Sequence, residues 1–219
     1  MSEIDAISSR SRQEIFARLK KAYHIPGFTP EKLPDPVQYI RMGDDLLEDF
    51  CTNAQANMFV LHRCIKENLT AKINAILKEE GAKSLLYPQG LSLDVTKLEV
   101  KDKLCYDQPI ENIRAEVFDA TAGIVCCQCA VASHGAVLVS SGPQQPRLLS
   151  LAVPLCIMLL PKERIVKSIC EALSQVQVRP DGKLPANIVF ISGPSRTSDI
   201  ELKTVYGVHG PQQVHLMVF

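Results

Sequence analysis

A short stretch near the C-terminal end of the sequence concentrates the side chains that can do chemistry. It runs from Gly193 to Glu201 as GPSRTSDIE, and a second stretch, GVHGP, follows at 207–211. The exposed amides of a helix beginning near Ser198, with Arg196 beside them, suit a carboxylate or a phosphate. We therefore predict a ligand-facing turn. The predicted binding residues in it are Gly193, Ser195, Arg196 and Thr197.

The same stretch is equally typical of a plain connection between a strand and a helix. Ser195 and Thr197 are ordinary capping residues, and Arg196 can be a surface arginine. Residue types alone leave both interpretations open.

Candidates for acid–base chemistry lie in and after this stretch. Asp199 and Glu201 are candidate catalytic carboxylates, although the helix dipole favours carboxylates in a first turn without any catalytic role. His209, in a loop between two glycines, can face the same crevice as a general acid or base. A histidine that only hydrogen-bonds its loop is the commoner case. His215 alternates with apolar neighbours in the last strand, so we expect it to be structural.

A cluster of cysteines offers a second kind of chemistry. Cys126, Cys127 and Cys129 crowd together, with His134 and Cys156 as further donors. In a helix only residues 126 and 129 of the three would share a side, and two sulfurs make an incomplete metal site. No CxxC pair occurs in the sequence. We therefore assign no metal here, and buried free cysteines are the alternative.

Composition excludes several classes of protein. The sequence has 24 basic and 24 acidic residues and no tryptophan, which disfavours nucleic-acid binding by bulk charge or by stacking. The longest apolar run, 148–160, contains Pro154 and is too short for a membrane span. Charges at 3–21 leave no apolar core for a secretion signal, so we expect a cytoplasmic protein. The expected ligand is a small anion.

Two domains are predicted. Residues 1–36 form an N-terminal helix, to about Tyr23, and a proline-rich linker. This helix is a candidate arm for contacts in a homo-oligomer. Residues 37–219 form an α/β domain.

Helical and extended patterns alternate along the second domain. Helices are expected at 70–81, at 121–132 and over 165–173, and strands at 84–87, 136–140, 187–191 and 214–219. This alternation predicts a mainly parallel sheet with helices on both faces. Ligands of such sheets bind at the carboxyl ends of strands, and we place the Gly193 turn at such an end, after a central strand.

The stretches GPSRTSDIE and GVHGP resemble the C-terminal signature of the lactate-utilisation (LUD) domain family, as in its LutC/YkgG group. Gly123-Ile124, the run 131–139, Arg147 and Pro154 extend the resemblance over roughly the last hundred residues. It implies a fold similar to the NagB/RpiA/CoA-transferase-like group. It also implies a role in oxidising L-lactate to pyruvate, alongside partner proteins. The iron–sulfur clusters are expected in these partners and not in this chain.

The middle of the sequence departs from the family pattern. Ser133 and His134 stand where the family usually has an acidic residue and a threonine, and Cys156 stands where it tends to have a histidine. His134 can replace a missing donor, so we add His134 and Arg147 to the candidate ligand-binding residues.

Two functional hypotheses follow from the resemblance. In the first, the chain is an accessory or ligand-binding subunit of L-lactate utilisation. In the second, it is an independent enzyme, in which Glu201 or Asp199 acts on an acyl or phosphorylated substrate.

Overall fold

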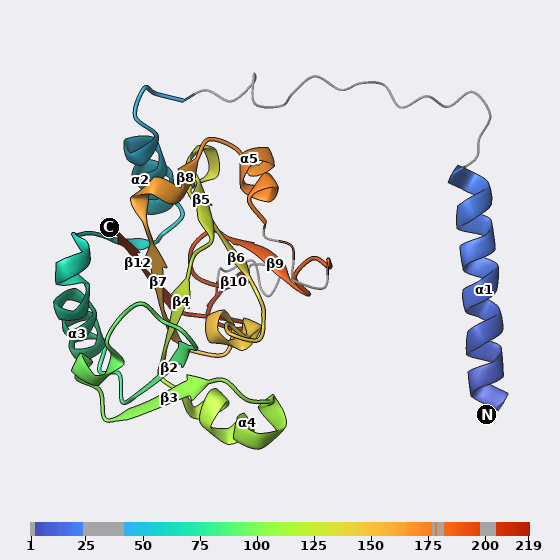
Figure 1. Ribbon diagram of the computed structural model, residues 1–219, viewed down its shortest axis with the longest axis horizontal. Coiled ribbons are helices and arrows are strands. Elements are labelled where there is room, and N and C mark those ends of the chain that lie inside the picture. The colour runs from blue at the N-terminus through green and yellow to red at the C-terminus, as the bar shows by residue number, and fades with distance from the viewer. Residues whose placement is uncertain (1–2, 24–41, 177, 179–181, 198–204) are drawn as a thin grey trace. The chain divides into compact units, whose positions relative to one another are not determined.

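The computed structural model describes residues 3–23, 42–176, 178, 182–197 and 205–219 (Figure 1). The chain divides into two compact units, Met1–Pro36 and Val37–Phe219. In the first unit, α1 (Glu3–Tyr23) ends where the sequence predicted. One face of α1 exposes the apolar side chains Ile15, Phe16 and Leu19.

The second unit is built on a six-stranded sheet in which all strands are parallel. This confirms the predicted fold class. The strand order is β1 (Val60–Arg63), β12 (Gln213–Val218), β7 (Leu155–Leu160), β4 (Ala122–Cys126), β2 (Ser84–Pro88) and β3 (Asp102–Tyr106).

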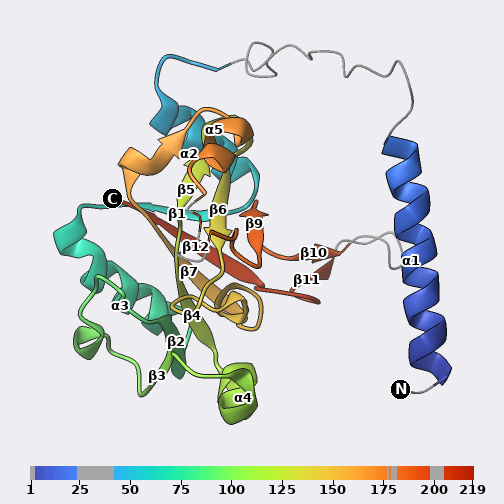
Figure 2. The same cartoon turned by 45° about the vertical axis from the view of Figure 1, so that its right-hand side comes forward.

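A second sheet of four strands lies beside the first (Figure 2). Its order is β8 (Ile165–Val166), β5 (Cys129–Val131), β6 (Ala136–Ser140) and β9 (Ile188–Ile191). Strand β6 is antiparallel to both β5 and β9. The strand predicted at 187–191 is therefore at the edge of this second sheet, and its predicted place in the centre of a parallel sheet was wrong.

The layers follow from the alternation of side chains along buried strands. On β7, Cys156 and Met158 point into one hydrophobic cluster, and Ile157 and Leu159 point into another. The first cluster lies between the two sheets and includes residues of α2 (Leu46–Ala56). The second cluster packs against α3 (Leu69–Glu79). A third cluster lies between the second sheet and α5 (Ile169–Ser174). Each sheet therefore has apolar side chains on both faces.

The remaining elements are short. Helix α4 (Ile110–Asp119) flanks β3 (Figure 1). The 3₁₀-helices are η2 (Lys66–Asn68), η3 (Val95–Lys97), η4 (Ala132–His134), η5 (Arg147–Ser150) and η6 (Lys162–Arg164). A ribbon of β10 (Arg196–Thr197) and β11 (Val205–Tyr206) completes the fold. None of the helices in the described ranges is long and apolar enough to cross a bilayer.

Two predicted helices were wrong. Residues 121–132 form β4 and β5, because β-branched residues such as Ile124 and Val131 alternate between separate apolar layers. The helix expected over 165–173 is split between β8 and α5. Helix α5 begins only after Ser168, whose side chain accepts a hydrogen bond from the Glu171 amide.

Candidate functional site

The two Gly-Pro segments lie against each other. The Ser195 amide donates to the Pro211 carbonyl at 2.9 Å, and the Gly207 amide donates to the Ser195 carbonyl at 3.0 Å. Strands β10 and β11 continue this pairing as a narrow ribbon (Figure 2). Arg196 and His209, which the sequence placed at one crevice, both line one pocket.

This pocket has a volume of about 350 Å³. Its polar lining comes from Arg196, His209 and three serines, Ser150, Ser192 and Ser195. Its apolar lining comes from Leu151, Phe190, Ile191, Pro194, Pro211 and Val214, with Gly193 and Gly210 between them. Among the described residues that line it, none is a carboxylate. The pocket thus joins positive charge and hydroxyl groups to an apolar wall.

Arg196 is held in place by its own turn. One of its terminal nitrogens donates to the Ser192 carbonyl at 3.1 Å. A guanidinium carries five N–H donors, and its geometry suits carboxylate or phosphate oxygens. The imidazole of His209, across the pocket, can donate to the same anion or take a proton from a hydroxyl group beside it.

Gly193 explains how the turn gets its shape. Its φ of +90° is costly for other residues, and a Cβ at this position would overlap the carbonyl oxygen of Asn57. Gly135 is under the same constraint, with a φ of +55° and its Cα against the backbone of Asn53. Both glycine turns therefore pack against the last turn of α2 and the residue after it.

Two asparagines at this end of α2 form hydrogen bonds with the turn at Gly135. The Asn53 side chain donates to the Ala132 carbonyl at 2.8 Å, and the Asn57 side chain donates to the His134 carbonyl at 2.7 Å. Neither asparagine was predicted from the sequence as a functional residue. Their four-residue spacing, which places both on one side of a helix, was the only available signal.

The pocket lies beside the amino ends of β7 and β12. The Gln212 amide donates to the Pro154 carbonyl at 2.8 Å, which ties the second Gly-Pro segment to the residue just before β7. The prediction that the Gly193 turn lies at the carboxyl end of the parallel sheet was wrong. The turn follows β9, which belongs to the second sheet and runs antiparallel to β6.

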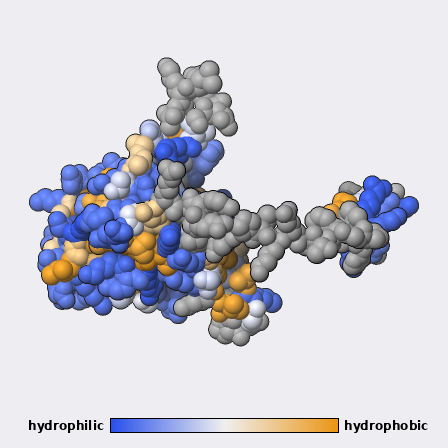
Figure 3. Space-filling view, turned by 90° about the horizontal axis from the view of Figure 1, so that it is seen from above, coloured by the Kyte–Doolittle hydropathy of each residue, from blue (hydrophilic) through white to orange (hydrophobic). Residues whose placement is uncertain are grey.

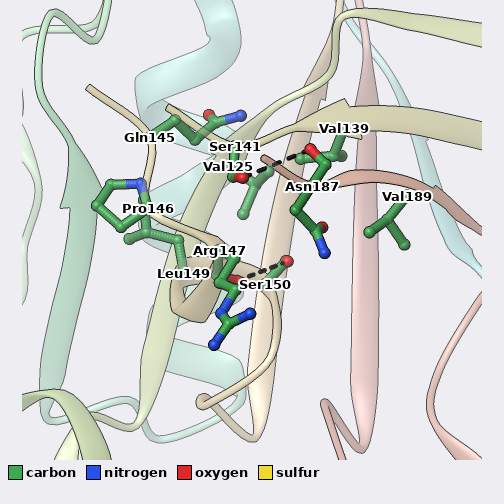
Figure 4. A pocket seen from close by; sticks show the side chains of 10 residues that line it. All are labelled: Val125, Val139, Ser141, Gln145, Pro146, Arg147, Leu149, Ser150, Asn187 and Val189. Carbon is green, nitrogen blue, oxygen red and sulfur yellow. Dashed lines mark hydrogen bonds between the residues drawn. The ribbon is translucent and has the colours of Figure 1, made fainter. Parts of the chain in front are cut away.

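Arg147 lies in a separate crevice, which shares only Ser150 with the main pocket. The volume of the crevice is about 10 Å³, which is close to the minimum that holds a single water molecule. The Arg147 guanidinium points away from the Ser141 and Asn187 end of the crevice (Figure 4). Gly123 allows η5 to lie this close to β4, because a Cβ there would stand 2.7 Å from the Leu149 carbonyl oxygen.

The other candidate residues lie elsewhere. His134 is exposed at the end of η4, with Nδ1 at 2.7 Å from the Ser133 hydroxyl, and does not line the pocket. Thr197 belongs to β10 and is also outside the lining. Asp199, Glu201 and the helix expected from Ser198 lie outside the described residues.

The cysteine cluster does not converge. Cys127 belongs to the apolar layer between the sheets, Cys129 to the layer under α5, and Cys126 packs against the layer under α3. Burial raises the pKa of Cys126, Cys127 and Cys129, and raises that of Cys156 to about 12. In the described ranges, no three side chains of metal-ligand type come together.

Comparisons with known proteins agree with this architecture. The chain is 26% identical, over 94% of its own length and 92% of the relative's, to an uncharacterized protein of Neisseria meningitidis serogroup B. It is 29% identical to lactate utilization protein C of Shouchella clausii, over 80% of each chain.

A solved structure also shares the fold. It is a DUF162 family protein from Deinococcus radiodurans, with a TM-score of 0.60 and 20% identity. The similarity covers 79% of this chain and 95% of that one. The LUD domain family matches residues 47–219, which include both sheets, the pocket and all of α2 after its first residue. The chain therefore belongs to the LUD domain family.

Proposed function

We propose that this protein is an accessory, ligand-binding component of L-lactate utilisation. In this role it binds the carboxylate of L-lactate or pyruvate between Arg196 and His209, while iron–sulfur partner proteins accept the electrons. The observation that carries the proposal is the pocket itself, in which the two Gly-Pro segments bring a guanidinium and an imidazole together without a carboxylate among the described lining residues. The relatives named lactate utilization protein C supply the metabolic context.

The chemistry of a 2-hydroxy acid matches this lining. Arg196 can form charge-assisted hydrogen bonds with the carboxylate, and His209 can hydrogen-bond the hydroxyl or the oxo oxygen. The apolar wall of Ile191 and Val214 suits a methyl group. Oxidation of the hydroxyl removes two electrons and two protons. In this proposal the partner clusters take the electrons, His209 takes the hydroxyl proton, and water takes the other proton.

A partner is supported by the surface around the pocket. A neighbouring pocket shares Leu151, His209 and Gly210 with the first, and is bordered by Phe118 and Val208. Leu151, Phe118 and Val208 are all exposed. Seen from above, much of the body's surface is hydrophilic (Figure 3), so such apolar residues beside a polar pocket suit a protein contact.

Binding of small acids tests the first part of the proposal. Calorimetric titration of the full chain with L-lactate and with pyruvate should give a dissociation constant of roughly 1 mM or tighter. Arg196→Gln should weaken binding about tenfold or more, because it removes the charged donor. Arg18→Gln, at an exposed position on α1, is the matched control and should bind as wild type does. Absence of binding, or equal binding by Arg196→Gln, would refute the assignment.

Co-purification tests the second part. The protein from lactate-grown cells should be recovered with iron–sulfur proteins, and a deletion strain should grow poorly on L-lactate. Growth should return with the wild-type gene and not with Arg196→Gln. Normal growth of the deletion strain would rule out the metabolic role.

A further inference from the structure

A half-buried histidine, His62, and a buried one, His215, lie at the β1 edge of the parallel sheet, away from the pocket. His62 on β1 and His215 on β12 stack with ring centroids 5.1 Å apart and planes 14° apart. His62 Nε2 lies 3.0 Å from His215 Nδ1, so the rings also share a hydrogen bond. Met217, on the same face of β12 as His215, packs in the cluster against α3. The pair therefore lies between the sheet and that helix.

The second ring nitrogen of His215 is an anomaly. His215 is 3% exposed, and its Nε2 has no hydrogen-bond partner. The nearest oxygen of Glu80, which follows α3, is 3.6 Å away, too far for a hydrogen bond. A buried polar atom without a partner costs free energy, so this atom needs an explanation.

The carboxylate of Glu80 selects one protonation pattern. A bare Nε2 facing a carboxylate would place two acceptors together, so His215 should carry its proton on Nε2. Its Nδ1 is then an acceptor, and His62 must donate to it from its own Nε2. This gives a directed chain in which His62 donates to His215, and His215 points its N–H at Glu80.

Charged groups around the pair come from α3 and its end. Burial lowers the pKa of His62, and Lys72 lowers it further, while Glu79 opposes them. Burial also lowers the pKa of His215, as does His62, while Glu80 and Glu79 oppose them. Cys64, after β1, also lies near Lys72. On β7, the residue opposite His215 is the apolar Ile157. Both rings are therefore neutral around pH 7.

We propose that His62, His215 and Glu80 form a pH-sensitive latch, which fastens the end of α3 to the β1–β12 edge and holds the start of β12 in place. A first proton can enter at His62 Nδ1 and leave the chain of hydrogen bonds intact. A second proton would have to enter at His215 Nδ1, where it would oppose the His62 N–H and break the 3.0 Å contact. Acid therefore opens the latch. Val214, which precedes His215, lines the pocket, so opening reaches the binding site.

Hydrogen exchange on the full chain tests the latch without any ligand, so it is independent of the proposed lactate role. Between pH 7.5 and pH 5.5, the fraction of time that β1 and β12 amides are open should rise about tenfold in wild type. His62→Gln keeps a side-chain donor for His215 and adds an amide oxygen that can accept from a His215 protonated on Nδ1. Protonation then no longer breaks the contact, so this rise should disappear. His134→Gln, at an exposed histidine, is the matched control and should keep it. No rise in wild type, or the same rise in His62→Gln, would overturn the proposal.

Two further measurements examine its parts. Nitrogen NMR of wild type at pH 7.5 should show both rings protonated on Nε2, and a His215 ring protonated on Nδ1 would refute the directed chain. The sequence has no tryptophan, so Phe190→Trp gives a single fluorescent reporter in the pocket lining. Its emission should change over the same pH range as the exchange. A constant emission while the amides open would refute the connection to the pocket.

Discussion

The two faces of strand β12 lie in different environments. Val214 points toward the pocket, where loops meet, charges are exposed and glycines allow close backbone contacts. His215, the next residue, points toward α3, where its ring is buried and uncharged. The pocket side is shaped by backbone geometry and the α3 side by side-chain packing. The two faces should therefore respond differently to mutation and to pH.

The largest effect is expected for Gly193→Ala. The substitution forces a Cβ into the Asn57 carbonyl at a φ of +90°, so it should reduce the free energy of unfolding by about 3 kcal/mol. Urea unfolding of both proteins measures this difference. Gly142→Ala is the matched control, because a Cβ there meets open space, and it should change stability by less than about 0.5 kcal/mol. Equal losses in the two variants would show that the turn is not constrained by its backbone.

A smaller loss is expected for Asn57→Ala. The variant removes side-chain hydrogen bonds to the carbonyls of His134 and Gly135, which should cost about 1 kcal/mol. The slope of the urea transition should not change, because the unfolded state exposes the same surface. Gln55→Ala, on an exposed part of the same helix, serves for comparison. If both variants lose the same free energy of unfolding, the Asn57 hydrogen bonds between α2 and the His134 turn do not stabilise the fold.

On the α3 side of β12, the free energy of unfolding should depend on pH. The change should be smaller than the loss that Asn57→Ala causes at neutral pH. Burial lowers the pKa of both His62 and His215 in the folded protein below the ordinary value of 6.5. The unfolded chain then binds more protons in this range, so stability is full above about pH 6.5 and falls as the pH drops toward the folded pKa values. Thermal unfolding from pH 7.5 to pH 5.5 should show this fall. His62→Gln should reduce it, and an unchanged slope would assign the effect to other groups.

The smallest effect is expected for Arg63→Gln. Arg63 on β1 forms an exposed ion pair with Glu48 on α2 at 2.6 Å. Water and salt screen such pairs, so the melting temperature should change by less than about 2 °C. The change should be the same when Arg63→Gln is combined with a second mutation on either face of β12. A large change, or a strong coupling with Asn57→Ala, would mean that the two sides of the comparison are not independent.

The sequence predicted those elements that carry their own local signal. The end of α1, the strands β2, β6 and β12, and the meeting of the two Gly-Pro segments all agree with local periodicity or turn residues. The stretch 121–132 was wrongly predicted to be a helix. Its small apolar residues are buried on all sides, so they show neither a helical nor a strand period. Partners far apart in sequence, such as Asn57 with Gly193, or His62 with His215, leave no local pattern at all.

The order of strands in the parallel sheet has a consequence for how the chain folds. Strand β12 lies between β1 and β7, so among the described strands the first one of this sheet pairs only with the last one. During synthesis, β1 has no partner in this sheet until residues 213–218 have left the ribosome. Pairings of such long sequence separation are slow to form, and an unpaired edge invites aggregation meanwhile. The β1–β12 junction should thus be the last part of the sheet to assemble and a step at which chaperones protect the chain.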